Sequence, residues 1–434
     1  MVGNRLRTLW DDLRSSLWFL PGLMTAAAIA AAWALLQADR WVHAEELELG
    51  PWGYGGGADS ARQVLATIAG SIMTVTGVTF SITMVALVLA AGQYTPRVLR
   101  NFVGDRVNQT VLGVFVGTFL FTLLVLRALR AGDDAFVPAL AVTASIALAV
   151  VSLGFFLYFL HHMAEAIQVA NVIRNVARET QAEIARTFGA GEAFAGPALP
   201  RGGHRSAAGR GIASESEGYV IRIETEQLVE AAAEAGVTLE VPLSPGDFVS
   251  RGAPLALVRG AAAGDDALAD AVRGAFGVAP QRNLVQDPSY GFRQLVDIAV
   301  RALSPGVNDP TTACNCVDYL GAFLAELADR DWPDPEVRDD DGAVRVVAPR
   351  GSFAEYVDLA CTEIRRYGCA DLATTLRLFD ALSRAAAATD RPDRLDAFRE
   401  AAAALLEDSR RAITTTADRA QVDLAARRLE EALG

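Results

Sequence analysis

The sequence contains no lysine, so every basic side chain apart from histidine is an arginine. A phosphate-binding P-loop and a Schiff-base enzyme both need a lysine. A covalent carrier of biotin or lipoate needs one as well. These three classes of protein are therefore excluded, and no cofactor is expected.

Histidine and cysteine are scarce, with four of each in 434 residues, and the formal net charge is −13. A surface that binds nucleic acid is basic, so this charge argues against a nucleic-acid partner. Zinc sites need four ligands at short, paired spacings. The only histidine in the second half, His204, lies far upstream of Cys314, Cys316, Cys361 and Cys369. We therefore expect no metal centre and reduced thiols.

Hydrophobic residues make up 52% of the chain, and their long runs all lie before residue 164. Each run is close to or above the roughly 17 to 25 residues that cross a hydrocarbon core of about 30 Å as a helix. We predict a four-helix transmembrane domain over residues 1–163. Its spans are Leu17–Leu36, Val64–Ala91, Val111–Leu129 and Phe136–Leu160.

The charges of the connecting loops orient these spans. Arginines precede the first span and lie between the second and third, whereas the loop between the first and second is acidic. By the positive-inside rule, both termini are predicted to be cytoplasmic. Arg127 and Arg130, at the outer end of the third span, run against this rule.

The second span is unusual because it contains many hydroxyl side chains, which lie on two sides of the helix. A single strand cannot satisfy its backbone hydrogen bonds in lipid, so the span must be helical. On a helix, Thr67, Ser71, Thr74 and Ser81 form one stripe, and Thr76, Thr79 and Thr83 form a second. The helix is longer than the hydrocarbon core and must tilt, extend or break. Gly70 and Gly77 are candidate points for a break or a close helix approach.

Two interpretations of the stripes remain open, and both can hold, one for each stripe. Small and hydroxyl residues let membrane helices pack closely. Alternatively, one stripe lines a water-filled path in which hydroxyls replace part of an ion's hydration shell. The candidate pore-lining residues are Thr67, Ser71, Thr74, Gly77 and Ser81. No ionisable residue lies in the centre of any span, which argues against a proton-coupled pump and is compatible with a passive pore.

The cytoplasmic ends of the spans carry further candidates. After the second span come Gln93, Tyr94, Arg97 and Arg100. These four residues are candidates for a cytoplasmic mouth, where a ring of the two arginines around an oligomer axis would attract anions. The alternative is ordinary anchoring of the span. His161 and His162, with Glu165, are either a metal pair or interfacial residues at the end of the fourth span.

The chain after residue 163 is predicted to be cytoplasmic and α+β. Residues 164–211 are predicted to be a helical extension of the fourth span and a Gly/Ala/Pro-rich linker. Residues 212–262 carry strand patterns and are predicted to form a small domain, which we call the β module. Its segment "GDFVSRGAPLALV" resembles the hairpin of biotinyl/lipoyl-like barrel-sandwich modules without their lysine. Residues 263–434 have the apolar periodicity of helices.

One motif in this helical region ends one predicted helix and starts another. It comprises Ser304, Pro305, Gly306, Asn308, Asp309 and Pro310. An aspartate followed by a proline is typical of a helix start. The motif is either a helix–turn–helix corner or a binding site, because the free amides of a helix start attract anions.

Four segments together resemble a known family of bacterial membrane proteins. They are "FSITMVALVLAAGQYTPRVL" (Phe80–Leu99), the β module, "QDPSYGFRQLVDIA" (Gln286–Ala299) and "RALSPGVNDPTTA" (Arg301–Ala313). The combination is similar to the predicted membrane proteins called domain of unknown function 2254, from the first span to roughly residue 390. The resemblance implies four N-terminal spans and a cytoplasmic C-terminal region, with no activity or catalytic residues to carry over.

We therefore expect a multi-pass protein of the bacterial inner membrane that contacts lipid and forms a homo-oligomer. The favoured function is an ion channel or similar passive pore, with the second span lining the path for inorganic ions and the cytoplasmic half gating or assembling it. The alternative is a non-conducting scaffold or sensor whose cytoplasmic half binds a partner or a small ligand. An enzyme is not favoured, because the sequence shows no nucleophile–base pair, glycine-rich phosphate loop or metal cluster.

Overall fold

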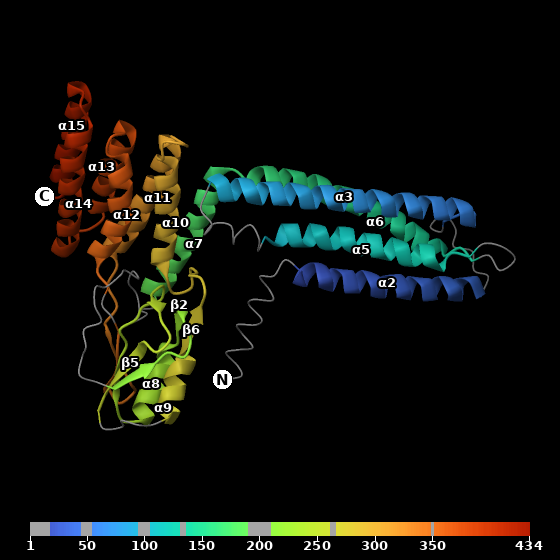
Figure 1. The fold of residues 1–434 in the computed structure, drawn as a ribbon, viewed down its shortest axis with the longest axis horizontal. Helices are drawn as coiled ribbons and strands as arrows, with labels where there is room; N and C mark the ends of the chain where they lie inside the picture. Colours follow the sequence, from blue (N-terminus) through green and yellow to red (C-terminus); the bar gives the residue numbers. More distant parts are fainter. Residues whose placement is uncertain are drawn as a thin grey trace. The chain divides into compact units, whose positions relative to one another are not determined.

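A computed structural model describes residues 18–44, 54–93, 105–130, 136–189, 210–260, 266–348 and 351–434. The chain forms two compact units, residues 1–168 and 169–434. The described part of the first unit is built from four long helices, and the second contains helices and two small sheets (Figure 1).

The helices of the first unit are α2 (Phe19–Ala44), α3 (Ala58–Gln93), α5 (Arg106–Ala128) and α6 (Ala139–Ala166). All four are long and apolar enough to cross a membrane, so the four predicted apolar helices are confirmed. α3 is unbroken over 36 residues, which makes it roughly 54 Å long. It therefore extends beyond a hydrocarbon core without breaking at either glycine of the second span.

α5 is the central helix of this unit. It packs against α2, α3 and α6, and α3 also contacts α6; α2 and α3 flank α5 (Figure 1). Glycines permit the closest approach: a Cβ at Gly117 would lie 3.2 Å from the Cβ of Ala28 in α2. Small residues at such contacts are how membrane helices pack, because lipid supplies no hydrophobic drive between them.

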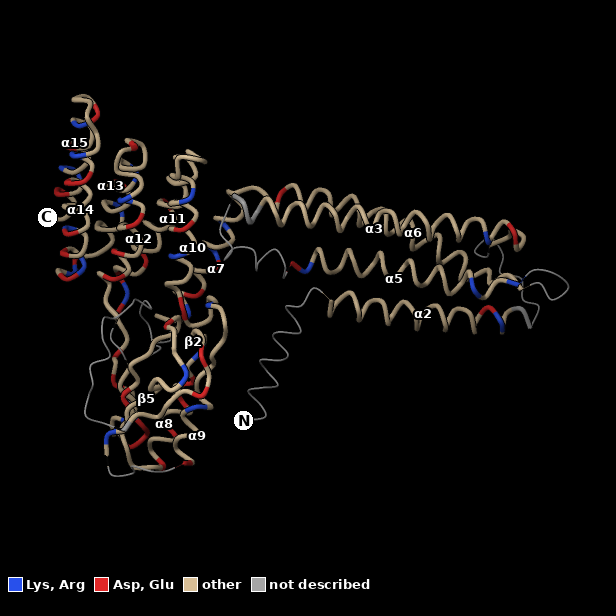
Figure 2. The backbone as a smooth tube through the Cα atoms, in the orientation of Figure 1, with Lys and Arg blue, Asp and Glu red and all other residues tan. Residues whose placement is uncertain are grey.

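Charged residues of the first unit lie near the ends of its long helices, whereas both signs are spread over the second unit (Figure 2). A charged side chain at the bilayer centre costs about 2.5–3.5 kcal/mol or more. This distribution supports four spans of the expected kind.

The second unit contains a five-stranded sheet of order β1-β5-β3-β8-β7 and a three-stranded sheet of order β4-β2-β6. Neighbouring strands are antiparallel except for β3 and β8. The strands are β1 (Arg210–Ala213), β2 (Gly218–Ile223), β3 (Thr238–Glu240), β4 (Phe248–Val249), β5 (Pro254–Arg259), β6 (Phe276–Ala279), β7 (Glu336–Arg338) and β8 (Val344–Val347). Strands from beyond residue 262 thus complete both sheets, and the barrel-sandwich likeness stays a prediction.

In the described part of the second unit, two short helices and seven longer ones accompany these sheets. They are α7 (Val169–Gly189), α8 (Thr225–Glu234), α9 (Asp266–Ala275), α10 (Pro288–Ala302), α11 (Pro310–Asp329), α12 (Phe353–Gly368), α13 (Leu372–Ala386), α14 (Pro392–Ala412) and α15 (Thr416–Ala432). α10 packs against α7, α11 and α12. The mixed helical and sheet character expected after the spans is confirmed. The helical extension predicted after the fourth span is interrupted, because α6 ends at Ala166 and α7 begins at Val169.

The four cysteines are free thiols. Cys316 and Cys361 are buried, and burial raises the pKa of Cys361 to about 12. Burial also raises the pKa of the half-buried Cys314 and Cys369. Because the thiolate is the reactive form, these side chains are poor nucleophiles near neutral pH.

Candidate pore-lining face and cytoplasmic motif

One side of α3 packs against other helices of the same chain. Ile72 and Ala86 are buried in a cluster with side chains of α5 and α6. Thr79, from the second predicted stripe, is 0% exposed, and Thr76 and Thr83 are half-buried. The second stripe therefore faces other helices of the same chain, as the packing interpretation predicts.

The opposite side of α3 carries the candidate pore-lining residues, and the structure brings them onto one face. Thr67, Ser71, Thr74, Gly77 and Ser81 are all exposed in the single subunit. At about 100° per residue, Thr74 points roughly 160° away from the buried Ile72. We call these five residues, with Gly70, the polar face of α3.

The polar face has a repeat that the sequence predictions missed. Thr67, Thr74 and Ser81 recur every seven residues, and Gly70 and Gly77 follow the first two by three. These are the a and d positions of a heptad, a spacing that gives left-handed supercoils. A Cβ built on either glycine meets no atom within 4 Å, so the face is open to a further helix or to water.

The threonine hydroxyls of this face donate within their own helix. Thr67 Oγ1 donates to the Gln63 carbonyl at 2.8 Å, and Thr74 Oγ1 donates to the Gly70 carbonyl at 3.0 Å. A hydroxyl oxygen also has two acceptor lone pairs. The face consequently offers acceptors, which suit a cation or a donor from another helix.

The interior of the subunit's bundle is closely packed. Phe115, Phe121 and Phe159 are at most 1% exposed and lie between the helices. The hydroxyls of Thr118 and Ser152 are 3.1 Å apart and join α5 to α6. Such interiors are packed as densely as organic crystals, which leaves little room for water between these helices.

Asp39 of α2 supplies a cap that α6 lacks. Its two carboxylate oxygens accept the Leu140 and Ala141 amides at 2.8 and 2.9 Å, and the residue is 3% exposed. Pro138, at the N-cap position, makes no side-chain cap hydrogen bond. Asp39 therefore satisfies helix-start amides from a neighbouring helix.

Asp39→Ala should reduce the free energy of unfolding by about 1–2 kcal/mol, because loss of a capping side chain costs that much. Thermal unfolding of the purified protein in detergent measures the loss. Asp39→Asn retains an acceptor oxygen and should lose less. Equal stability of Asp39→Ala and the wild type would contradict the assigned role.

The predicted cytoplasmic mouth lies mostly outside the described residues. Gln93 is the last residue of α3, and Tyr94, Arg97 and Arg100 fall in the undescribed segment. Their role at a mouth stays a prediction.

The histidines at the end of α6 pair with single carboxylates. His162 Nε2 is 2.5 Å from Asp105 Oδ2, and Asp105 Oδ1 accepts the Val107 amide at the start of α5. His161 Nε2 is 3.4 Å from Glu165 Oε1. Among the described residues, no group of three His, Cys, Asp or Glu side chains could hold a metal ion. This geometry favours interfacial residues over a metal pair.

The cytoplasmic motif forms the turn between α10 and α11. Ser304 follows α10, Pro305 and Gly306 are exposed in the turn, Asn308 has a φ of 50°, Asp309 is the N-cap and Pro310 begins α11. The Asp309 carboxylate accepts the Thr312 amide at 3.1 Å and the Thr312 hydroxyl at 2.6 Å. It therefore occupies the amide that an incoming anion would use, and the geometry favours a corner.

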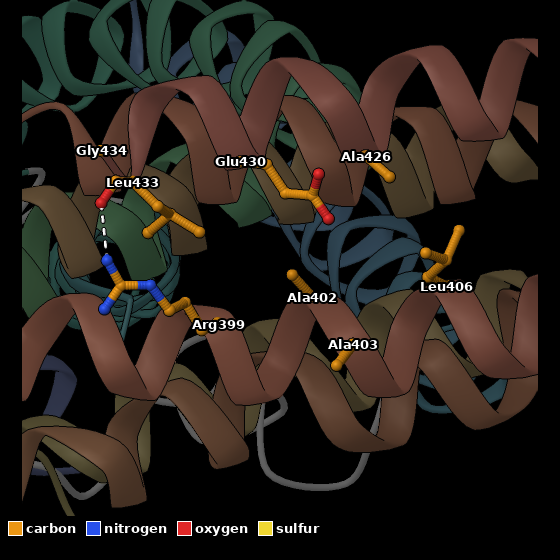
Figure 3. Close-up of a pocket in the computed structure, with 8 residues that line it drawn as sticks. All are labelled: Arg399, Ala402, Ala403, Leu406, Ala426, Glu430, Leu433 and Gly434. Carbon is orange, nitrogen blue, oxygen red and sulfur yellow. Dashed lines mark hydrogen bonds between the residues drawn. The ribbon is translucent and has the colours of Figure 1, made fainter.

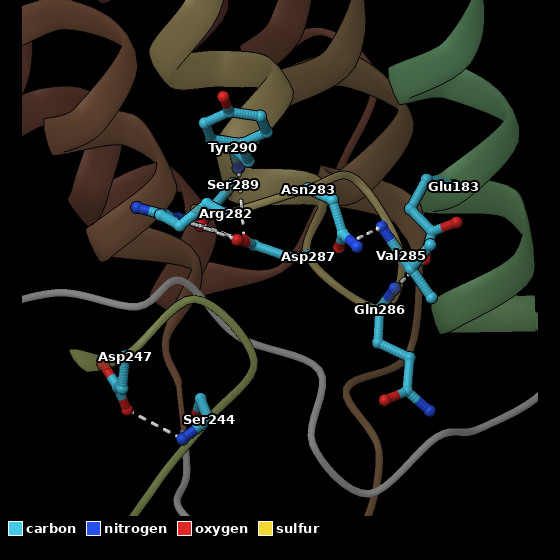
Figure 4. Close-up of polar contacts among 10 residues, drawn as sticks. All are labelled: Glu183, Ser244, Asp247, Arg282, Asn283, Val285, Gln286, Asp287, Ser289 and Tyr290. Carbon is cyan, nitrogen blue, oxygen red and sulfur yellow. Dashed lines mark hydrogen bonds and ion pairs between the residues drawn. The ribbon is translucent and has the colours of Figure 1, made fainter. Parts of the chain in front are cut away.

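Figure 4 shows a second polar cluster, which lies just before α10 and which the sequence analysis did not predict. Arg282 donates to both carboxylate oxygens of Asp287, which is 1% exposed and caps α10. Burial raises the pKa of Asp287, and the Arg282 guanidinium opposes this shift. The adjacent Gln286 has a φ of 57°. Asp-Pro is the same start signal as in the Asn-Asp-Pro corner. The partners of Asp287 lie within five residues of it, whereas Gln286 contacts residues far away in the sequence.

A groove of about 400 Å³ lies between α14 and α15 (Figure 3). Alanines and leucines line it, with Arg399 and Glu430 on its two helices. Arg399 donates to the Leu433 carbonyl at 2.7 Å. The groove shares no residue with the polar face of α3 or the cytoplasmic motif.

Comparison with known proteins places the chain among membrane proteins. Residues 14–384 match the family described as "Predicted membrane protein (DUF2254)". An uncharacterized protein of Mycobacterium bovis and one of Mycobacterium tuberculosis are each 32% identical over 441 residues, 99% of this chain and 82% of the relative. No solved structure matches the chain. α14, α15 and their groove lie beyond the family match but within the alignment to these relatives.

Proposed function

We propose, from the premise that the chain belongs to the DUF2254 family of predicted membrane proteins, that it is a homo-oligomeric passive pore for inorganic ions in the bacterial inner membrane. α3 of each subunit lines the path, and both termini are cytoplasmic. The cytoplasmic half gates or assembles the pore.

The observation that carries this proposal is the exposure of the polar face of α3. By contrast, the exposed side of α6 carries large apolar side chains, such as Val150, Leu153 and Leu157. Hydroxyls and glycines facing acyl chains gain no hydrogen-bond partner and little packing, whereas around a symmetry axis they can contact water or one another. The seven-residue repeat supports a supercoiled ring of α3 helices.

The packed interior of the single subunit supports the same arrangement. With Phe115 and Phe159 filling the centre, the remaining route for ions lies between subunits. Heterologous contacts that close on themselves generate rings, and a ring places one α3 from every subunit at its axis. Such a pore is incomplete without its partners.

Conduction by the purified full-length protein in planar lipid bilayers tests the proposal. Single-channel steps that disappear when the protein is omitted support it. Silence at all voltages in several monovalent and divalent salts, with correctly folded and inserted protein, overturns it.

The second candidate function, a non-conducting scaffold or sensor, has one observation in its favour. The hydroxyl hydrogens of Thr67 and Thr74 already donate to carbonyls of α3. Two α3 helices could therefore pack directly against each other without leaving these donors unpaired. An oligomer whose α3 helices meet directly at the axis, without conduction, would support this function.

A further inference from the structure

Gln286 contacts two elements through different parts of the residue. Its backbone N–H donates to Glu183 Oε1 of α7 at 2.7 Å (Figure 4). Its side-chain amide accepts the Ile223 N–H at 2.8 Å and donates to the Ile223 carbonyl at 3.3 Å. One residue therefore ties α7 to the end of β2.

The backbone of Gln286 must be held in place for this. Its φ of 57° lies in the left-handed region, which costs a residue with a side chain about 1 kcal/mol or more. In this conformation the N–H reaches α7 while the side chain reaches β2. Both contacts hold Gln286 in this backbone conformation. Loss of the contact with Glu183 should therefore weaken the contact with Ile223, and the reverse.

The loop around Gln286 is fixed at its α10 end. The Asp287 carboxylate accepts from Arg282, from the Ser289 hydroxyl at 2.6 Å and from the Tyr290 amide at 3.2 Å. A buried carboxylate with this many partners moves only at a high cost. A displacement of Gln286 is therefore not absorbed by the rest of the loop.

α7 is well placed to move Gln286. Only Ile167 and Gln168 separate it in the chain from α6, the fourth span. Glu183 also binds Arg186 and Thr187 within α7, so its carboxylate moves with the helix. A shift of α7 is thereby passed to the Gln286 amide.

We propose that Gln286 is a mechanical joint that couples α7 to the three-stranded sheet, so that displacement of α7 releases the end of β2. The Glu183 carboxylate holds the Gln286 backbone, and the Gln286 side chain holds Ile223. The joint makes the β module sensitive to movement of the helix that follows the last span. This role does not depend on conduction.

Hydrogen exchange at the Ile223 amide, in the full-length protein in lipid nanodiscs, tests the joint. Glu183→Ala should raise this exchange by about tenfold, although the Ile223 amide donates to Gln286 and not to Glu183. In Gln286→Gly, which keeps the N–H and favours the positive φ, the Ile223 amide should already exchange faster. Adding Glu183→Ala to that variant should then change nothing further, which is the signature of coupling through one residue.

Gln181→Ala, on the exposed side of α7, is the matched control and should leave the exchange at Ile223 unchanged. The proposal is overturned if Glu183→Ala leaves exchange at the Ile223 amide unchanged. It is also overturned if Glu183→Ala raises this exchange equally in the wild-type and Gln286→Gly backgrounds. Exchange at the buried Leu320 of α11 reports general loosening. If Glu183→Ala also raises exchange at Leu320, the milder substitution Glu183→Asp is measured. This variant should raise exchange at Ile223 and leave exchange at Leu320 unchanged, and any other result overturns the proposal.

Discussion

Thr74→Leu should lower the single-channel current about tenfold or more. Thr74 lies in the middle of the polar face of α3 and is exposed in the subunit. A hydrogen bond to a charged group contributes on the order of 1.5–3 kcal/mol, and every 1.4 kcal/mol or so corresponds to a factor of ten in rate. Leucine removes the hydroxyl and places a branched apolar side chain in the proposed path.

Val150→Leu is the matched control for this measurement. Val150 is 67% exposed on α6, away from the polar face, and the change adds a methylene without removing any hydroxyl. It should leave the current at its wild-type value. An unchanged current in Thr74→Leu, or the same loss in both variants, would remove α3 from the path.

Gly291→Ala should destabilise the second unit by about 2–3 kcal/mol, the upper part of the range for overpacking. A Cβ at Gly291 of α10 would lie 1.9 Å from Thr180 Oγ1 and 2.6 Å from Thr180 Cγ2 in α7. Thr180 is fully buried, so its side chain cannot swing away. α7 and α10 must separate, and denaturant unfolding followed by tryptophan fluorescence measures the loss.

Gly306→Ala is the control for that substitution, because a Cβ at Gly306 meets nothing within 4 Å; its stability should equal that of the wild type. Thr180→Ala removes the two nearest atoms and should recover part of the loss in Gly291→Ala. Full stability of Gly291→Ala alone would show that α7 does not lie directly against α10.

The sequence predicts the spans well because hydropathy is a local property. The four apolar runs became four helices, and the requirement for backbone hydrogen bonds in lipid correctly overrode the strand propensity around Thr74. The two hydroxyl stripes were also separable from spacing alone. The stripe that packs inside the chain could not be identified from spacing, because this depends on how α5 and α6 pack against α3. Thr79 is buried in the structure and Thr74 is exposed.

Contacts between distant residues were harder to predict. The Asp39 cap joins residues about a hundred positions apart, and the Gln286 contacts to Glu183 and Ile223 span 103 and 63 positions. No local pattern encodes such pairs. The short strands β6 and β7 were missed for a similar reason, since three or four residues gain strand character only through their neighbours in the sheet.

Water access at position 74 tests the central claim most directly. Membranes that contain Thr74→Cys or Val150→Cys are treated with a charged methanethiosulfonate reagent that does not enter lipid. The wild-type protein gives the background reaction of the native thiols, which is slow because burial raises their pKa. If α3 lines an aqueous path, the thiol at position 74 is modified well above background and the one at position 150 is not. A thiol at position 74 that stays as unreactive as the one at position 150 would contradict the account.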